Sequence, residues 1–256
     1  NFNRNKKLIK EAGEIEDLMI NHDIKFMFTK GILNIKNNIY NDIGERMIGD
    51  IDFLVDKKDM KKAIKLLVGA GYHQKYKYKL WKTKDMPKFI SPKKIGALEP
   101  HYEFLIYRKR KVLLAKTIME NFKKCKFELL ISKTILNYQI NDYGHLFASY
   151  NYRTIYDYIS IINKKTKEVD LNKNKYLKRF FLVTNMLNIT NYQLKLNIYD
   201  YLFLVRFKAV HKSYIYYKIN KLICIILKNI PVKLMQIIEF LVNKNYRDHV
   251  LKILFR

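Results

Sequence analysis

The strongest constraint on the fold is the segment 49–55, Gly-Asp-Ile-Asp-Phe-Leu-Val, an apolar strand candidate that carries two carboxylates. Side chains at positions i and i+2 of a strand point to the same face, so Asp50 and Asp52 are predicted to project together. Two adjacent like charges are costly unless a cation lies between them. Mg²⁺ prefers oxygen ligands and shares them with substrate phosphates, so the pair predicts a metal site. The alternative is a surface pair of aspartates at a strand edge.

The neighbouring segments favour phosphate chemistry at the same place. Lys30 and Gly31 follow a predicted strand over 24–28 and open a predicted short helix. Glycine allows close backbone approach, a helix N-terminus attracts phosphate, and a lysine adds a point charge to a triphosphate. Glu99 lies on a separate predicted strand and offers a third carboxylate. This combination is what two-metal phosphoryl transfer requires, in which an acid also accepts the proton of the incoming hydroxyl.

The hydrophobic periodicity changes along the chain. Up to about residue 110, helical and strand-like periods alternate, which is typical of a mixed sheet with flanking helices. Beyond residue 111, long patterns of period 3.6 dominate, with Asn- and Lys-rich breaks near 163–175 and 187–197. We therefore predict an α+β fold of two domains, a sheet domain at 1–110 and a helical bundle at 111–256.

The charge is strongly unbalanced, with 50 Lys and Arg against 23 Asp and Glu, a formal net charge of +27. One explanation is a polyanionic partner such as nucleic acid, nucleotide or an anionic membrane surface. The other is codon bias, because Lys, Asn, Ile, Tyr and Phe are abundant together, as in chains from AT-rich genomes. Only two cysteines occur, which excludes a disulfide scaffold and a Cys-rich zinc module.

Membrane insertion is not expected. The first residues are charged and amphipathic, without the apolar run of a signal peptide. The most apolar stretch, 222–227, is flanked and interrupted by Lys221, Lys228 and Lys233, which falls short of a spanning helix. We expect a cytoplasmic protein.

An ordered set of motifs resembles a known family. The set comprises Lys30-Gly31, Arg46-Met47-Ile48-Gly49-Asp50-Ile51-Asp52-Phe53-Leu54-Val55, Gly71-Tyr72, Glu99-Pro100-His101-Tyr102, and then His145, Arg153 and Asp157. It is similar to the uncharacterised bacterial nucleotidyltransferases of the DNA polymerase beta-like superfamily. The resemblance covers roughly residues 25–160, and the ordered set is more specific than any one of its members.

The resemblance implies a nucleotidyltransferase fold in the N-terminal half. It also implies that Asp50 and Asp52 are metal ligands and that Glu99 is the third acid. We expect Mg²⁺, with two ions, and Mn²⁺ as the alternative. The chain departs from the pattern at Glu99, where the family often has Asp, and at the Lys30-Gly31 step, which replaces the Gly-Ser step of the superfamily. Glu103 is the alternative third acid.

Four residues are predicted to bind the nucleotide, namely Lys30, Gly31, Arg46 and Gly49. Arg46 offers a bidentate fork for a phosphate or a carboxylate. The alternative is a structural ion pair with Asp42, Glu45 or Asp50.

A second group is predicted to line the cleft. His101 either orients the surroundings of Glu99 and contacts substrate, or is structural. His145, Ser149, Arg153 and Asp157 are spaced by four and would form one stripe on a helix. That stripe either faces the nucleotide or is a solvated face with an ordinary Arg153–Asp157 pair.

The segment Tyr72–Trp81 interleaves aromatic and basic residues. This composition suits nucleic-acid contact through stacking and phosphate pairing. It suits equally a strand with one aromatic core face and one solvated lysine face.

These patterns predict metal-dependent transfer of a nucleoside monophosphate from an NTP, ATP among the candidates, to an acceptor hydroxyl. The acceptor is expected to be RNA, especially a tRNA end, or a small hydroxylated molecule. A tRNA acceptor would fit a toxin of a toxin–antitoxin pair, with an antitoxin as partner. One alternative is a non-catalytic nucleic-acid-binding protein that retains the fold. A weaker one is a peripheral membrane protein that uses basic C-terminal helices, such as 218–228.

Overall fold

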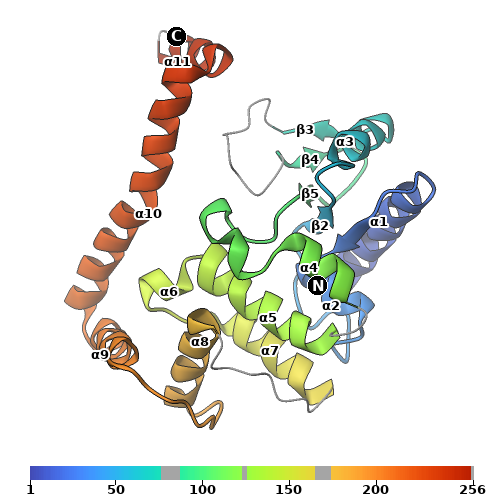
Figure 1. Cartoon of the computed structure of the whole chain (residues 1–256). Coiled ribbons are helices and arrows are strands. Elements are labelled where there is room, and N and C mark those ends of the chain that lie inside the picture. Colours follow the sequence, from blue (N-terminus) through green and yellow to red (C-terminus); the bar gives the residue numbers. More distant parts are fainter. Residues whose placement is uncertain (76–86, 123–125, 165–173, 255–256) are drawn as a thin grey trace.

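The computed structural model describes residues 1–75, 87–122, 126–164 and 174–254 (Figure 1). It is a mixed α+β fold, as predicted, with a five-stranded sheet in the N-terminal half and helices in the C-terminal half. Most of the aromatic and basic segment predicted to be strand-like, from residue 76 onward, lies outside the described residues.

The sheet has the strand order β1-β2-β5-β4-β3. The β2 and β5 strands run parallel, and the other neighbouring pairs are antiparallel. The strands are β1 (Phe26–Phe28), β2 (Ile51–Val55), β3 (His73–Gln74), β4 (Phe89–Ile90) and β5 (Leu98–His101). All five residues of β2 are buried, so the strand with the two-carboxylate motif lies in the middle of the fold.

Three helices accompany the sheet in the first part of the chain, α1 (Phe2–Ile20), α2 (Lys30–Lys36) and α3 (Met60–Gly69). The α1 helix buries Leu8, Ala12, Ile15 and Met19, which recur at helical spacing. Its Glu11 carboxylate accepts hydrogen bonds from the backbone N–H groups of Ile95 at 2.8 Å and Gly96 at 2.9 Å. The loop that leads into β5 is thereby fastened to α1.

The remaining helices follow the sheet. They are the 3₁₀ segment Tyr107–Val112, α4 (Ala115–Asn121), α5 (Lys126–Leu136), the π-helical turn Asn137–Asn141, α6 (Gly144–Phe147), α7 (Tyr152–Lys164), α8 (Lys175–Met186), α9 (Ile198–Lys212), α10 (Tyr214–Val242) and α11 (Lys244–Leu254). The α5 helix packs against α7, α8 and α2, and so joins the helical part to the sheet.

One apolar core runs from α1 to α8. It contains Leu8 and Phe53 from the sheet part and Ile131, Tyr158 and Phe181 from the helical part. The buried cluster therefore has members on both sides of residue 110, and a domain boundary at that residue stays a prediction.

The C-terminal helices are arranged differently. The α10 helix extends along one side of the molecule and contacts α6, α9 and α11 (Figure 1). Most of its large apolar side chains are exposed, with Leu241 67% exposed as an example. Arg206 of α9 donates hydrogen bonds to the carbonyl of Leu146 and the side chain of Asn220, which ties α9 and α10 to α6. In the described part of the chain, no helix combines the length and the apolar character needed to cross a membrane.

The predicted single helical stripe is wrong. His145 lies on α6, which ends at Phe147, and Arg153 and Asp157 lie on α7. Between the two helices, Ala148 adopts a left-handed conformation with φ of 49°. A continuous helix cannot pass through a left-handed residue, so the spacing by four does not place these side chains on one face.

Candidate active site

The register of the two parallel strands builds the site. Asp52 on β2 lies opposite Glu99 on β5, and His101 follows two residues later on β5. Residues two apart on a strand share a face, and in-register neighbours on adjacent strands share it too. The sequence predicted that Glu99 lies on a strand that brings it to the aspartates, and the structure places it beside Asp52.

Three ligand-type side chains meet here. Atoms of Asp52, Glu99 and His101 all lie within 4.8 Å of one another. The His101 Nε2–H donates to Asp52 Oδ1 at 2.9 Å, and both side chains are buried. His101 therefore orients the aspartate carboxylate and lies within reach of the same ion.

Two lysines neutralise the carboxylates. Lys30 Nζ lies 2.5 Å from Asp52 Oδ1 and 3.8 Å from Glu99 Oε2. Lys88 Nζ bridges Asp50 Oδ2 at 2.7 Å and Glu99 Oε1 at 2.5 Å. Because Lys88 bonds to both, Asp50 faces the same site as Glu99 although it precedes the first residue of β2. We call Asp50, Asp52 and Glu99 the carboxylate site.

The pKa values of Asp52 and Glu99 are shifted in opposite directions. Burial alone would raise the pKa of Asp52, but the His101 hydrogen bond and the Lys30 charge hold that pKa below its ordinary value. Burial and the charge of Asp52 raise the pKa of Glu99. Asp52 is thus a permanent anion, whereas Glu99 is the stronger base.

The backbone at the start of α2 aims Lys30 at the aspartate. Lys30 has φ of 51°, the left-handed region that non-glycine residues rarely adopt. The preceding Thr29 N–H donates to the Asp52 carbonyl at 2.8 Å, which fixes α2 to β2. Such strain costs about 1–3 kcal/mol and occurs mainly at functional sites.

Gly31 and Gly49 each have a local contact in the structure, and their role in nucleotide binding stays a prediction. A Cβ on Gly31 would meet Arg46 Nη1 at 2.6 Å, so the guanidinium group fills the space that glycine leaves. The carbonyl of Gly49 accepts a hydrogen bond from Arg4 at 3.0 Å, and a Cβ at this position would meet open space.

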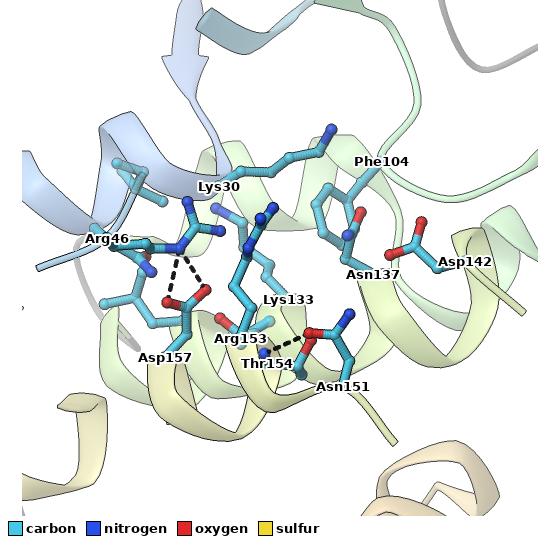
Figure 2. A pocket seen from close by; sticks show the side chains of 14 residues that line it. Lys30, Arg46, Phe104, Lys133, Asn137, Asp142, Asn151, Arg153, Thr154 and Asp157 are labelled. Atoms are coloured by element: carbon cyan, nitrogen blue, oxygen red, sulfur yellow. Dashed lines mark hydrogen bonds and ion pairs between the residues drawn. The ribbon is translucent and has the colours of Figure 1, made fainter. Parts of the chain in front are cut away.

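Arg46 makes a buried ion pair. Its Nε donates to Asp157 Oδ1 at 2.8 Å and Oδ2 at 3.0 Å, as Figure 2 shows. The Tyr40 hydroxyl also donates to Asp157 Oδ1 at 2.7 Å. The sequence suggested an ion pair with Asp42, Glu45 or Asp50, and the observed partner comes from α7 instead.

A pocket of about 220 Å³ lies beside the carboxylate site, lined by residues of α2, α5 and α7 (Figure 2). Its charged lining residues are Lys30, Arg46, Lys133, Asp142, Arg153 and Asp157. We call it the basic pocket. Lys30 belongs to both sites, because it lines the pocket while its ammonium group binds Asp52.

Two predicted residues lie elsewhere. His145 forms a hydrogen bond through Nδ1 with the Gln139 carbonyl and packs edge-to-face on Tyr176, with ring centroids 4.9 Å apart. Burial lowers its pKa, and it lines neither the pocket nor the carboxylate site. Glu103, the alternative third acid, lies beyond the end of β5 and outside the Asp52–Glu99–His101 group.

Lys88 and Lys133 are site residues that the sequence patterns did not predict. Lys88 precedes the two-residue β4 strand, and no spacing rule connects it to the aspartates. The sequence pattern around Lys133 could have predicted it, because Leu130 and Leu136, each three residues away, place it on the buried face of α5. A lysine on an apolar helical face is a candidate functional group.

The donor set fits a divalent cation. Carboxylate oxygens are the ligands that Mg²⁺ prefers. In this structure the ammonium groups of two lysines lie next to these oxygens and neutralise their charge. Asp52, Glu99 and His101 offer the ligand atoms that could hold the ion. Asp50 lies outside this group, and its role as a metal ligand stays a prediction. A metal bound there would supply charge stabilisation for a transferring phosphoryl group.

The mixed sheet, with Asp52 and Glu99 paired on adjacent strands, has the arrangement that the resemblance implied for a nucleotidyltransferase. The family model described as an uncharacterised nucleotidyltransferase matches residues 1–179, and the chain belongs to that family. No significant match was found among curated proteins or among solved structures. The match confirms the resemblance in the motifs and establishes general nucleotidyl transfer as the class of reaction.

Proposed function

We propose that the protein transfers a nucleoside monophosphate from an NTP to an acceptor hydroxyl and releases pyrophosphate, with Asp50, Asp52 and Glu99 as the catalytic carboxylates. The observation that carries the proposal is the register of β2 and β5, which sets Asp52 opposite Glu99, together with the Lys88 bridge to Asp50. We propose Mg²⁺, as two ions, for this site, with Mn²⁺ as the alternative.

In the proposed transfer, one bond to the α-phosphorus forms and one breaks. The acceptor oxygen forms a bond to the α-phosphorus of the NTP, and the bond from that phosphorus to the bridging oxygen of pyrophosphate breaks. The hydroxyl proton passes to Glu99, whose pKa is raised by burial and by the neighbouring Asp52 charge. Asp52 stays ionised under the influence of His101 and Lys30.

The basic side chains have distinct proposed roles. Lys30 binds Asp52, and with a cation held at the carboxylates its ammonium group would be available to a phosphate of the NTP. Arg46 acts through its pair with Asp157, which fixes the wall of the pocket. A direct phosphate clamp by Arg46 would require this pair to open.

The acceptor classes follow from charge and from the superfamily. RNA, a tRNA end above all, fits the net charge of +27 and would make the protein a candidate toxin with an antitoxin partner. A small hydroxylated molecule fits the pocket beside the carboxylate site. ATP is one of four donors to be compared.

Label transfer tests the function. Purified protein with Mg²⁺ and each α-labelled NTP is offered total RNA, a metabolite extract, or no acceptor. The Asp50→Asn/Asp52→Asn double variant serves as the inactive form, and Asp17→Asn, an exposed position on α1, as the matched control. Label in one acceptor pool that persists in the control and disappears in the double variant supports the proposal. Transfer that survives in the double variant contradicts it.

A further inference from the structure

The basic pocket contains a buried amine without an acceptor. Lys133 is 3% exposed, and among the residues that the structure describes its Nζ has no hydrogen-bond partner. The rings of Phe104 and Phe122 lie 5.8 and 5.4 Å from that nitrogen. Burial lowers the pKa of Lys133 to about 7. An unsatisfied amine in such a place is costly unless a ligand supplies the missing acceptor.

Arg153 provides a second cation for the same space. It lies on α7, and Figure 2 shows its guanidinium group on the same side of the pocket as Lys133 and Arg46. Arg46 is engaged by two hydrogen bonds to Asp157. Arg153, by contrast, makes no hydrogen bond within the described ranges, although its charge acts on Asp157. Lys133 and Arg153 are therefore the basic groups that an anionic ligand can engage without breaking an ion pair.

The charges around Lys133 leave a positive balance. From α2, α5, α7 and the connecting segments, the basic groups Lys30, Arg46 and Arg153 face the pocket together with the acidic groups Asp142 and Asp157. Asp157 is neutralised by Arg46, and Lys30 by Asp52. The remaining charged groups of the lining are the basic Arg153 and Lys133 and the acidic Asp142. The basic groups outnumber the acidic one, so a ligand that brings one or two negative charges is favoured.

The uncharged lining suits hydroxyl groups. It consists of amide and hydroxyl side chains, Asn34, Asn137, Asn151, Thr134 and Thr154, with Leu33, Leu130 and Phe104. Side-chain amides and hydroxyls both donate and accept hydrogen bonds, as recognition of a polyol requires. A volume of about 220 Å³ is below the range of about 300–1,000 Å³ of drug-sized sites, so the occupant is small.

The same lining disfavours a stacked nucleobase. Base recognition in single-stranded RNA uses an exposed aromatic face. Phe104 is the aromatic residue of the lining, and the Lys133 amine lies over its ring.

Resting on the proposed nucleotidyl transfer, we propose that the basic pocket is the acceptor site and that the acceptor is a small hydroxylated anion, a phosphorylated or carboxylated polyol or sugar. Its anionic group binds Lys133 and Arg153, and the amides bind its hydroxyls. The attacking hydroxyl lies on the side of Lys30, the residue that the pocket shares with the carboxylate site.

Calorimetric binding tests the pocket without turnover. The probes are inorganic phosphate, glycerol 3-phosphate, glucose 6-phosphate and glucuronate, with glycerol and glucose as uncharged counterparts. They are titrated into the full chain and into the Asp50→Asn/Asp52→Asn variant, whose substitutions lie outside the residues that line the pocket. Lys133→Met keeps the length of the side chain without the charge, Arg153→Gln removes the second cation, and Lys116→Met is the matched control on the exposed face of α4.

We expect at least one anionic probe to bind and its uncharged counterpart not to bind. Lys133→Met should weaken binding by about tenfold or more, Arg153→Gln by a few-fold, and Lys116→Met not at all. A phosphate preference over glucuronate, or the reverse, identifies the anion.

Four outcomes overturn the proposal. The first is that no anionic probe binds at millimolar concentration, and the second is that Lys133→Met binds the probes as tightly as the unmodified protein. The third is that Lys133→Met weakens the binding of a non-hydrolysable NTP as much as that of the anionic probe. The fourth is that an RNA oligonucleotide binds in a way that depends on Lys133. The third would assign the pocket to the nucleotide, and the fourth to an RNA end. Label transfer separates the two proposals: if no NTP donates label while Lys133-dependent anion binding persists, the enzymatic function and the acceptor role fail and the anion site remains.

Discussion

The carboxylate site and the basic pocket share Lys30 but balance their charges in opposite ways. Each acid of the carboxylate site has a lysine within 2.7 Å, so the site is satisfied by the chain itself. In the basic pocket, the buried Lys133 has no acceptor within the described part of the chain. A satisfied acid cluster has to exchange a lysine for a metal ion, whereas an unsatisfied amine only gains from a ligand. The difference indicates that binding at the two sites can be separated by substitution.

The largest expected effect is a loss of nucleotidyl transfer without a loss of anion binding in the basic pocket. Asp52→Asn removes the permanently charged oxygen that His101 and Lys30 hold in place. We expect nucleotidyl transfer to fall by about 10³-fold or more, because a metal supplies several kcal/mol of charge stabilisation. Calorimetry with glycerol 3-phosphate should show that the same variant binds at least as tightly, because Lys30, which lines the pocket, loses its anionic partner. Parallel losses of activity and of phosphate binding would show that the two sites are not independent.

The second prediction concerns the wall of the pocket. Asp157→Asn leaves the Arg46 guanidinium without its buried partner and weakens the Tyr40 contact. Breaking a buried pair in this way costs about 3–5 kcal/mol. Urea unfolding should show this loss. Glu120→Gln, which removes one partner of the exposed Lys116–Glu120 pair, should cost less than about 1 kcal/mol. Equal effects of the two substitutions would contradict a structural role for the Arg46–Asp157 pair.

The third prediction tests the unsatisfied amine through pH. Lys133→Met should stabilise the fold by about 1–3 kcal/mol near neutral pH, because a buried unpaired polar group is removed. The folded pKa of Lys133, about 7, lies below its ordinary value of 10.5. Between these values the unfolded chain binds more protons, so the stability of the unmodified protein rises with pH and the advantage of the variant shrinks.

Thermal unfolding from pH 7 to pH 10 measures that advantage. A constant difference between the two proteins across this range would show that Lys133 is not held as a neutral amine. Lys116→Met provides the baseline, since its side chain is 80% exposed.

The sequence predicted the fold class and much of the carboxylate site. The segment 49–55 predicted a strand that carries Asp52, and Glu99 could be anticipated as a third acid on another strand. Asp50 precedes that strand, and it reaches the site through the Lys88 bridge, which the alternation could not predict. The register between β2 and β5 cannot be read from the local sequence pattern of either strand. The pairing of Asp52 with Glu99 therefore needed the three-dimensional structure.

The basic pocket was harder to predict because its residues come from distant segments. Arg46 and Asp157 are 111 residues apart, and their ion pair depends on how α7 packs against the sheet part. The spacing by four from His145 to Asp157 was misleading, since left-handed Ala148 interrupts the helix. Helical spacing specifies one face only where the backbone stays helical throughout.

The smallest expected effect concerns the exchange of lysine for metal. Lys88 bonds to Asp50 and Glu99, and these hydrogen bonds raise its pKa above the ordinary value despite burial, so it is a cation at neutral pH. A divalent ion must compete with this ammonium group for the same oxygens. Lys88→Met should therefore tighten Mg²⁺ or Mn²⁺ binding by a few-fold, measured by calorimetry, because the side chain is 42% exposed and solvent screens its charge. Asp50→Asn/Asp52→Asn should abolish the same binding. Weaker metal binding in Lys88→Met would mean that Lys88 positions the carboxylates for the ion instead of competing with it, and that the charge balance of the carboxylate site serves pre-organisation.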